Sequence, residues 1–145
     1  MAIEQGLDRV IFTGHISDRD LLDGLYMAAS LFVFPSLYDT AGLVVREAAV
    51  MGTPSVVVKN TAPAEVISDG LNGLVCSDDT VSLCDVMERY LFGMSENERA
   101  NIRKNAQKSV PLPWDTVMKE VEERYRALIL KGKPKRKSLL SHLTP

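Results

Sequence analysis

The sequence predicts an α/β fold in which a parallel sheet is flanked by helices. Short apolar runs alternate with longer amphipathic stretches along the 145 residues, which is the pattern of strands and helices in such a fold. Runs such as LFVF and PSVVV are apolar on both faces, as expected of buried parallel strands. Hydrophobic residues make up 46% and charged residues 25% of the chain, which is ordinary for a soluble globular protein.

Four short apolar runs are expected to be strands: Val10–Thr13, Leu31–Phe34, Pro54–Val58 and Gly73–Cys76. Ser17 is predicted to be the N-cap residue of a helix, because acidic residues follow it. Thr40–Met51 is predicted to be an apolar helix that ends at Gly52. Further helical segments are expected at residues 63–67, 78–92, 95–108 and 114–131.

The predicted sheet is short for a Rossmann-like domain, which usually has about six strands. A few helical residues at 2–7 are expected before the first strand, so we expect that upstream sequence is missing. The chain is expected to consist of one partial domain at residues 1–131 and a basic, flexible tail at residues 132–145.

Charge and cysteine content restrict the function classes. A net charge of −2 gives no reason to expect nucleic-acid binding. The one basic cluster, KGKPKRKS at 131–138, is expected to be solvated, although it would also suit contact with anionic lipid. Cys76 and Cys84 lie in apolar contexts and are expected to be buried, reduced thiols. Without a signal peptide or a long apolar run, a cytoplasmic location is expected.

Two acidic residues carry the most informative pattern in the chain. Asp39 stands before the apolar helix, and Glu47 lies inside it with seven residues between them. At about 100° per residue, Glu47 falls between Leu43 and Val50 on the helical wheel. Glu47 is therefore predicted to lie on the buried apolar face. A buried carboxylate is costly unless it has a partner, so Glu47 is a candidate for holding a ligand.

The start of this helix is a candidate phosphate site. A helix N-terminus presents free N–H groups and a positive dipole end, and Gly42 allows close approach to the backbone. A phosphate between two carboxylates that accept hydrogen bonds from hydroxyls suits a sugar nucleotide. Two more ordinary interpretations stay open. Asp39 can be a simple N-cap or turn residue, and Glu47 can pair with a core Arg or Lys other than Arg46, which points about 100° away.

The same segment resembles the signature of the retaining GT-B glycosyltransferases of group 1, also called glycosyltransferase family 4, which include glycogen-synthase-like enzymes. The matching residues are Pro35, Ser36, Asp39, Gly42, Leu43, Glu47, Ala48, Gly52 and Pro54. The stretches VIFTGHIS, AEVISDGLNGLV and PWDTVMKEVEERY resemble the same family. The likeness covers about residues 8–128. It implies the C-terminal half of a GT-B fold, truncated at its N-terminus.

The resemblance also implies roles for single residues. Glu47 would bind the ribose hydroxyls of the donor nucleotide, and Asp39 would act as the catalytic residue at the hydroxyls of the transferred sugar. Thr40 and Ala41 stand in place of an aromatic-containing version, so one apolar wall of the donor site, where Thr40 would bind, is smaller. The remaining donor-binding residues would be Gly42, Leu43 and Val44 at the diphosphate and Gly14, His15 and Ile16 beside the nucleobase.

The implied activity is transfer of a hexose from a UDP-, GDP- or ADP-sugar to an acceptor hydroxyl with retention. The nucleotide sugar is a substrate, and no cofactor or metal is implied, since Asp78 and Asp79 read as a helix start. The acceptor-binding N-terminal domain of the same protein would be a partner, with helix 114–131 crossing back to it. Peripheral contact with a membrane is an expectation for the full-length enzyme. The chain alone is expected to be inactive.

Other classes of function stay open. A noncatalytic α/β regulatory or receiver-like module would use Asp39 and Lys59 in a phosphorylation pocket, but it leaves Glu47 without a role. A sugar-nucleotide epimerase or a phosphorylase on the same fold would need catalytic residues of its own.

Overall fold

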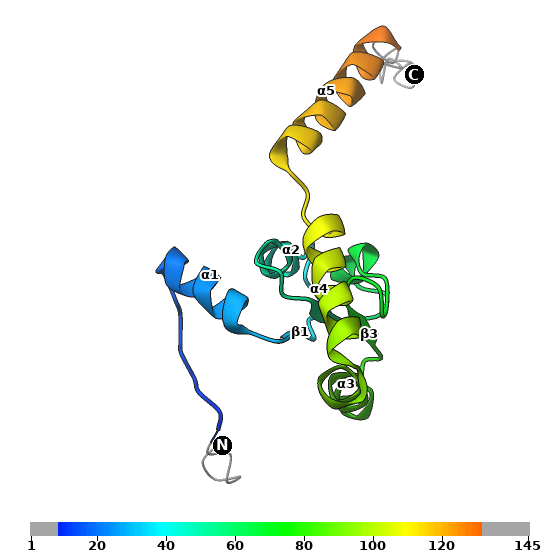
Figure 1. The fold of residues 1–145 in the computed structure, drawn as a ribbon. Helices are drawn as coiled ribbons and strands as arrows, with labels where there is room; N and C mark the ends of the chain where they lie inside the picture. The colour runs from blue at the N-terminus through cyan, green and yellow to red at the C-terminus, as the bar shows by residue number, and fades with distance from the viewer. Residues whose placement is uncertain (1–8, 132–145) are drawn as a thin grey trace, which may run out of the picture. The chain divides into compact units, whose positions relative to one another are not determined.

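The computed structural model describes residues 9–131 (Figure 1). The predicted helical start at residues 2–7 and the predicted basic tail at 132–145 lie outside the described residues. The chain divides into two compact units, one ending at Pro111 and the other beginning at Leu112. The first unit holds the sheet, and the described part of the second, residues 112–131, holds one long helix.

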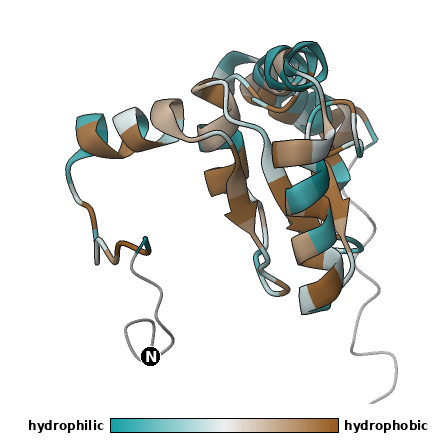
Figure 2. Cartoon of the chain, turned by 60° about the horizontal axis from the view of Figure 1, so that its bottom comes forward, coloured by the Kyte–Doolittle hydropathy of each residue, from teal (hydrophilic) through white to brown (hydrophobic). Residues whose placement is uncertain are grey.

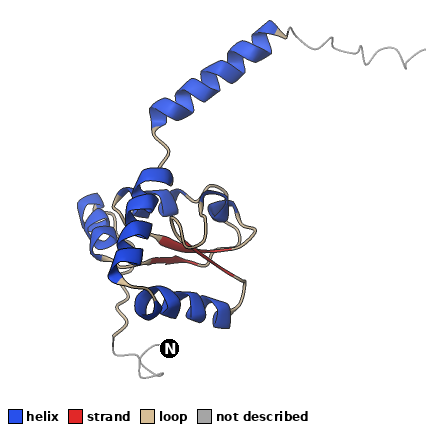
Figure 3. Ribbon diagram, turned by 45° about the vertical axis from the view of Figure 1, so that its right-hand side comes forward, coloured by secondary structure: helices blue, strands red, loops and turns tan. Residues whose placement is uncertain are grey.

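A parallel sheet of three strands organises the first unit. Its strands are β1 (Phe32–Phe34), β2 (Ser55–Val58) and β3 (Leu74–Cys76), and they lie side by side in that order. Val33 pairs with Val56, and Val57 pairs with Val75. Figure 3 shows these strands among the surrounding helices. The structure thus confirms the α/β class and three of the four predicted strands.

The strand expected at Val10–Thr13 is wrong. These residues form no regular element, and the side chains of Ile11 and Phe12 are 85% and 80% exposed. A strand is stable only when a neighbour takes up its backbone hydrogen bonds. In residues 9–131, β1 pairs only with β2, and no described strand lies beside Val10–Thr13.

Both faces of the sheet are covered, because β2 alternates its side chains between two apolar clusters. Val57 packs with Val45 and Ala49 of α2, with Ala106 of α4 and with Val110, the C-cap residue of α4. Val56 and Val58 point to the opposite face and pack with Leu74, Cys76, Tyr90 and Ile102. Figure 2 shows the strands as a hydrophobic centre. This burial on both faces explains why the strand sequences are apolar throughout.

One helix precedes β1 and another follows it. Helix α1 (Arg19–Ala28) has Asp18 as its N-cap, whose side chain accepts a hydrogen bond from the Leu21 amide. The prediction of Ser17 as N-cap is therefore wrong by one residue. Helix α2 (Leu43–Val50) begins three residues later than expected. It ends as predicted before Gly52, whose φ of +81° suits glycine.

The rest of the first unit also follows the predicted order of elements. A 3-10 helix, η2 (Ala62–Val66), leads to β3, and α3 (Thr80–Glu88) continues into a π-helical turn, η3 (Arg89–Gly93). Helix α4 (Glu96–Ser109) follows its N-cap residue Ser95, which forms a capping box with Glu98. The N-cap of α3 is Asp79, as the sequence indicated.

The second unit is α5 (Trp114–Leu130), the predicted closing helix. It begins directly after its N-cap residue Pro113. Val117, Val121 and Leu128 recur at helical spacing and give it one apolar side. None of the described helices combines the length and hydropathy that crossing a bilayer requires.

Candidate functional site

The candidate site lies where β1 and β2 end. Because the strands are parallel, the β1–α2 loop and the β2–η2 loop leave the same edge of the sheet. Gly42 and Pro63 bring these loops together. A Cβ at Gly42 would lie 3.1 Å from the Pro63 Cα, and Gly42 has a φ of +60°. Glycine is therefore favoured at position 42 by its backbone conformation, and a side chain there would also press against Pro63.

Asp39 closes the turn that leads into α2. Its Oδ1 accepts hydrogen bonds from the Ala41 amide, at 2.9 Å, and from the Gly42 amide. This is the turn-forming role that the sequence left open as the ordinary interpretation. In the part of the chain that the structure describes, Oδ2 has no hydrogen-bond partner. The carboxylate is thus fixed by one oxygen and retains the other as an acceptor.

The first turn of α2 offers two free backbone donors. The amides of Val45 and Arg46 both donate to the Gly42 carbonyl, at 3.0 and 3.2 Å. The amides of Leu43 and Val44 have no acceptor among the described residues. Free N–H groups at the positive end of a helix dipole attract anions. Thr40, beside this turn, is exposed.

Glu47 is not buried among apolar side chains, so that prediction is wrong. The core face of α2 consists of Val45, Ala48 and Ala49, whereas Leu43 is 64% exposed. Val45 lies about 160° around the helix from Glu47. The arc that carries Glu47 is therefore the arc turned away from the sheet, and the Glu47 side chain is 34% exposed.

The partner of Glu47 is Arg19, the first residue of α1. The Arg19 Nη1 donates to the Glu47 Oε1 at 3.2 Å, and the Arg19 Nε lies 3.2 Å from the Asp23 Oδ1. The hydrogen bond and charge of Glu47, followed by the charge of Asp23, raise the pKa of Arg19 above its usual value. Arg46 instead donates to the Val110 carbonyl at 2.6 Å, which agrees with the prediction that it does not pair with Glu47.

Sequence reasoning missed Arg19 and Asp23. The i, i+4 spacing of an Arg and an Asp was a visible signal for a pair within α1. The contact between Arg19 and Glu47 spans 28 residues, and no local pattern indicates it.

The segment before α1 contains the residues expected at a nucleobase. Gly14 has a φ of +66°, Gly14 and His15 are exposed, and Ile16 is half-buried. No hydrogen bond joins these three residues to α2 within residues 9–131. Their role at a nucleobase stays a prediction.

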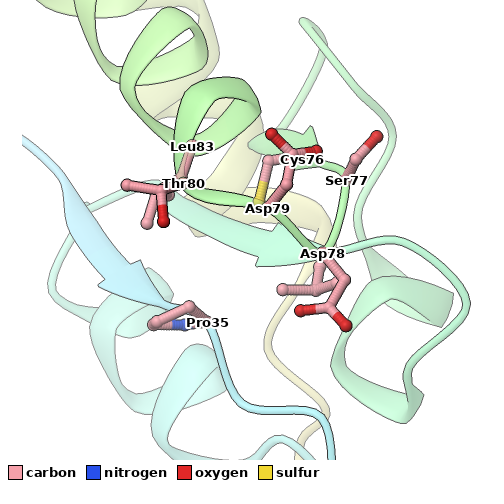
Figure 4. A pocket seen from close by; sticks show the side chains of 8 residues that line it. Pro35, Cys76, Ser77, Asp78, Asp79, Thr80 and Leu83 are labelled. Carbon is pink, nitrogen blue, oxygen red and sulfur yellow. The ribbon is translucent and has the colours of Figure 1, made fainter.

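A pocket of about 300 Å³ lies at the carboxyl ends of all three strands (Figure 4). Its lining residues are Pro35, Val58, Cys76, Ser77, Asp78, Asp79, Thr80 and Leu83. The Asp79 Oδ1 accepts from the Ser82 amide at 2.7 Å, so this carboxylate serves as the cap of α3. Burial raises the pKa of the Cys76 thiol. Within residues 9–131, no three His, Cys, Asp or Glu side chains form a group that could hold a metal ion.

Comparison with known proteins gives consistent results. A family model described as glycosyl transferases group 1 matches residues 1–92. An uncharacterized glycosyltransferase of Methanocaldococcus jannaschii is 33% identical over 121 residues, which are 81% of this chain and 30% of that protein. A GDP-mannose-dependent alpha-(1-6)-phosphatidylinositol dimannoside mannosyltransferase of Mycobacterium tuberculosis is 40% identical over 88 residues, which are 61% of this chain and 23% of that protein.

Among solved structures, the sucrose-phosphate synthase of Thermosynechococcus elongatus superposes with a TM-score of 0.77 and 28% identity. The match covers 90% of this chain and 33% of that one. The chain therefore spans about a third or less of the length of the proteins that it matches.

Proposed function

Since the chain belongs to the group 1 glycosyl transferases, we propose that it forms the donor-binding domain of a retaining hexosyltransferase. The whole enzyme moves a hexose from a nucleotide diphosphate sugar to an acceptor hydroxyl. The chain spans 30% of the length of its relative from Methanocaldococcus jannaschii. We therefore assign acceptor binding to a separate N-terminal domain and expect no transferase activity from this chain alone.

The arrangement at the start of α2 carries the proposal. The free amides of Leu43 and Val44 lie next to Asp39, whose second oxygen has no partner in the described chain. Glu47 follows one turn later, roughly 6 Å along the helix axis from Leu43. Backbone N–H groups that can bind an anion thus lie between two carboxylates that can bind hydroxyls. A nucleotide diphosphate sugar has the matching order, because its diphosphate lies between a ribose and a hexose.

In this site the backbone supplies the electrostatic part of catalysis. The Gly42, Leu43 and Val44 segment binds the diphosphate, and the free N–H groups of Leu43 and Val44 stabilise the negative charge that grows on the leaving nucleotide. The free Asp39 oxygen accepts hydrogen bonds from hexose hydroxyls, beside Thr40. Glu47 accepts from the ribose hydroxyls, and Gly14, His15 and Ile16 border the base.

The relatives suggest which donor to test first. The mannosyltransferase of Mycobacterium tuberculosis is named for its dependence on GDP-mannose. GDP-hexoses are therefore the first candidates for this chain. The same name includes a phosphatidylinositol dimannoside, which is a lipid, and this supports the proposal that the full-length enzyme makes peripheral contact with a membrane.

Ligand-observed NMR tests the proposal directly. The chain is mixed with GDP-, UDP- and ADP-hexoses, and the measurement is repeated with Glu47→Gln and with Glu88→Gln, an exposed position on α3. We expect one nucleotide sugar to bind, about tenfold weaker binding by Glu47→Gln, and no change in Glu88→Gln. If none of the three classes of sugar binds, or if Glu47→Gln binds like the parent chain, the proposal is wrong.

A further inference from the structure

An ion pair joins Arg19 of α1 to Glu47 of α2, beside the candidate site. Arg19 reaches Glu47 with one nitrogen and Asp23 with another, each at 3.2 Å. The Arg19 side chain is 56% exposed and the Glu47 side chain 34% exposed. Ion pairs that are this exposed contribute little to stability. The pair is therefore better explained by what it does to Glu47 than by what it does to the fold.

The pairing uses only half of the Glu47 carboxylate. Oε1 accepts from Arg19, whereas Oε2 has no hydrogen-bond partner in the part of the chain that the structure describes. A glutamate side chain without a partner samples several rotamers, so ligand binding has the entropic cost of restricting it to one of them. With Oε1 held, Oε2 presents an acceptor in a fixed direction.

Asp23 in turn holds Arg19. The Asp23 Oδ1 is buried and has no hydrogen bond of good geometry within residues 9–131, so the Arg19 charge is its compensation. The pair is spaced i, i+4 on α1, which keeps the guanidinium near its own helix. Arg19 is thus placed from one helix and acts on a residue of another.

We propose that Arg19 is a positioning residue, which fixes the Glu47 carboxylate so that its second oxygen receives the ribose hydroxyls of the donor. This inference rests on the proposed function, because it assumes that Glu47 meets a ribose. Preorganisation of one long side chain corresponds to an effect of about threefold to tenfold on affinity. The effect must disappear when the ribose hydroxyls or the Glu47 carboxylate are absent.

The test measures dissociation constants by NMR titration of the whole chain. The probes are GDP, UDP and ADP, each with its 2′,3′-dideoxy counterpart. The variants are Glu47→Gln, Arg19→Gln, the double variant, and Arg89→Gln, which removes a comparably exposed pair with Asp69. Amide spectra of each variant establish that it is folded. Arg19→Lys tests whether a positive charge alone is enough to position the Glu47 carboxylate.

We expect the parent chain to prefer the ribonucleotide. Arg19→Gln should weaken binding of the ribonucleotide about threefold to tenfold and leave binding of the dideoxynucleotide unchanged. The double variant should bind like Glu47→Gln, and Arg89→Gln like the parent chain.

The outcomes separate the two proposals. The parent chain can prefer the ribonucleotide over the dideoxynucleotide, and Glu47→Gln can lose this preference. If Arg19→Gln then keeps the preference of the parent chain, the role of Arg19 is wrong and the donor site stands. This role is also overturned if Arg19→Gln weakens the binding of the ribonucleotide and of the dideoxynucleotide equally, or if Arg19→Gln binds the ribonucleotide more tightly than the parent chain does. If the parent chain shows no binding or no preference for ribose, the proposed function itself fails.

Discussion

Gly42 lies against Pro63 so closely that a Cβ on Gly42 would be 3.1 Å from the Pro63 Cα. The contact joins the loop after β1 to the loop after β2. It also sets where α2 begins, because Gly42 is the N-cap residue and adopts a left-handed conformation. The free amides of the candidate site depend on this placement.

We predict that Gly42→Ala destabilises the first unit by about 1–3 kcal/mol, because alanine is strained at φ +60° and its Cβ meets Pro63. Gly24→Ala is the matched control. It lies inside α1, where an added Cβ meets nothing within 4 Å, and alanine there should stabilise by about 0.5–1 kcal/mol. Urea denaturation measures both. Equal stability of Gly42→Ala and the parent chain would contradict the described turn.

The two cysteines should differ in reactivity. Cys76 is buried in β3 and burial raises the pKa of its thiol, whereas Cys84 is exposed on α3. The expectation that both thiols are buried is therefore wrong for Cys84. We predict that an aromatic disulfide reagent modifies Cys84 rapidly and Cys76 only after unfolding, since the thiolate is the reactive form. Cys84→Ser should abolish the fast phase, and a fast phase in that variant would refute the burial of Cys76.

The start of α4 should make stability depend on pH. The Ser95 hydroxyl and amide donate to the Glu98 carboxylate at 2.7 and 2.8 Å, which lowers the pKa of Glu98. A lowered folded-state pKa means that the contribution is present above the unfolded value, about 4.3, and is lost as the pH falls through the folded value. The difference in free energy of unfolding between the parent chain and Glu98→Gln should therefore shrink on acidification below about pH 4.

Urea unfolding at pH 7 and at acid pH measures this effect. Glu88→Gln, an exposed change outside the capping box, is the control and should show no such change with pH. Ser95→Ala should cost about 1 kcal/mol at neutral pH, because it removes the N-cap acceptor. If the difference in free energy of unfolding between the parent chain and Glu98→Gln grows toward acid pH, the capping box is not formed by the ionised carboxylate.

The elements that the sequence predicted correctly are those with local signals. The strands β1, β2 and β3 are apolar runs closed by Pro or Gly or by turn residues, and the predicted cap Asp79 precedes α3 directly. Val10–Thr13 has the same local pattern as these strands. It is not a strand because pairing depends on a neighbour, and no run of residues specifies its own neighbour.

The position of Glu47 shows a second limit of sequence reasoning. Helix α2 has two apolar arcs, one with Val45, Ala48 and Ala49 and one with Leu43 and Val50. A helical wheel finds both arcs but does not say which one meets the sheet. The small residues allow the closer approach to β2, so Glu47 lies on the outer arc.

We propose that a nucleotide diphosphate sugar binds at the first turn of α2. The most direct measurement is an amide NMR titration of the isotope-labelled chain with GDP-mannose, UDP-glucose and ADP-glucose, and with the corresponding nucleosides. We expect one diphosphate sugar to shift the Leu43 and Val44 amide signals most strongly, and its nucleoside not to shift them. Shifts confined to Ser77–Leu83, around the pocket at the strand ends, would contradict it.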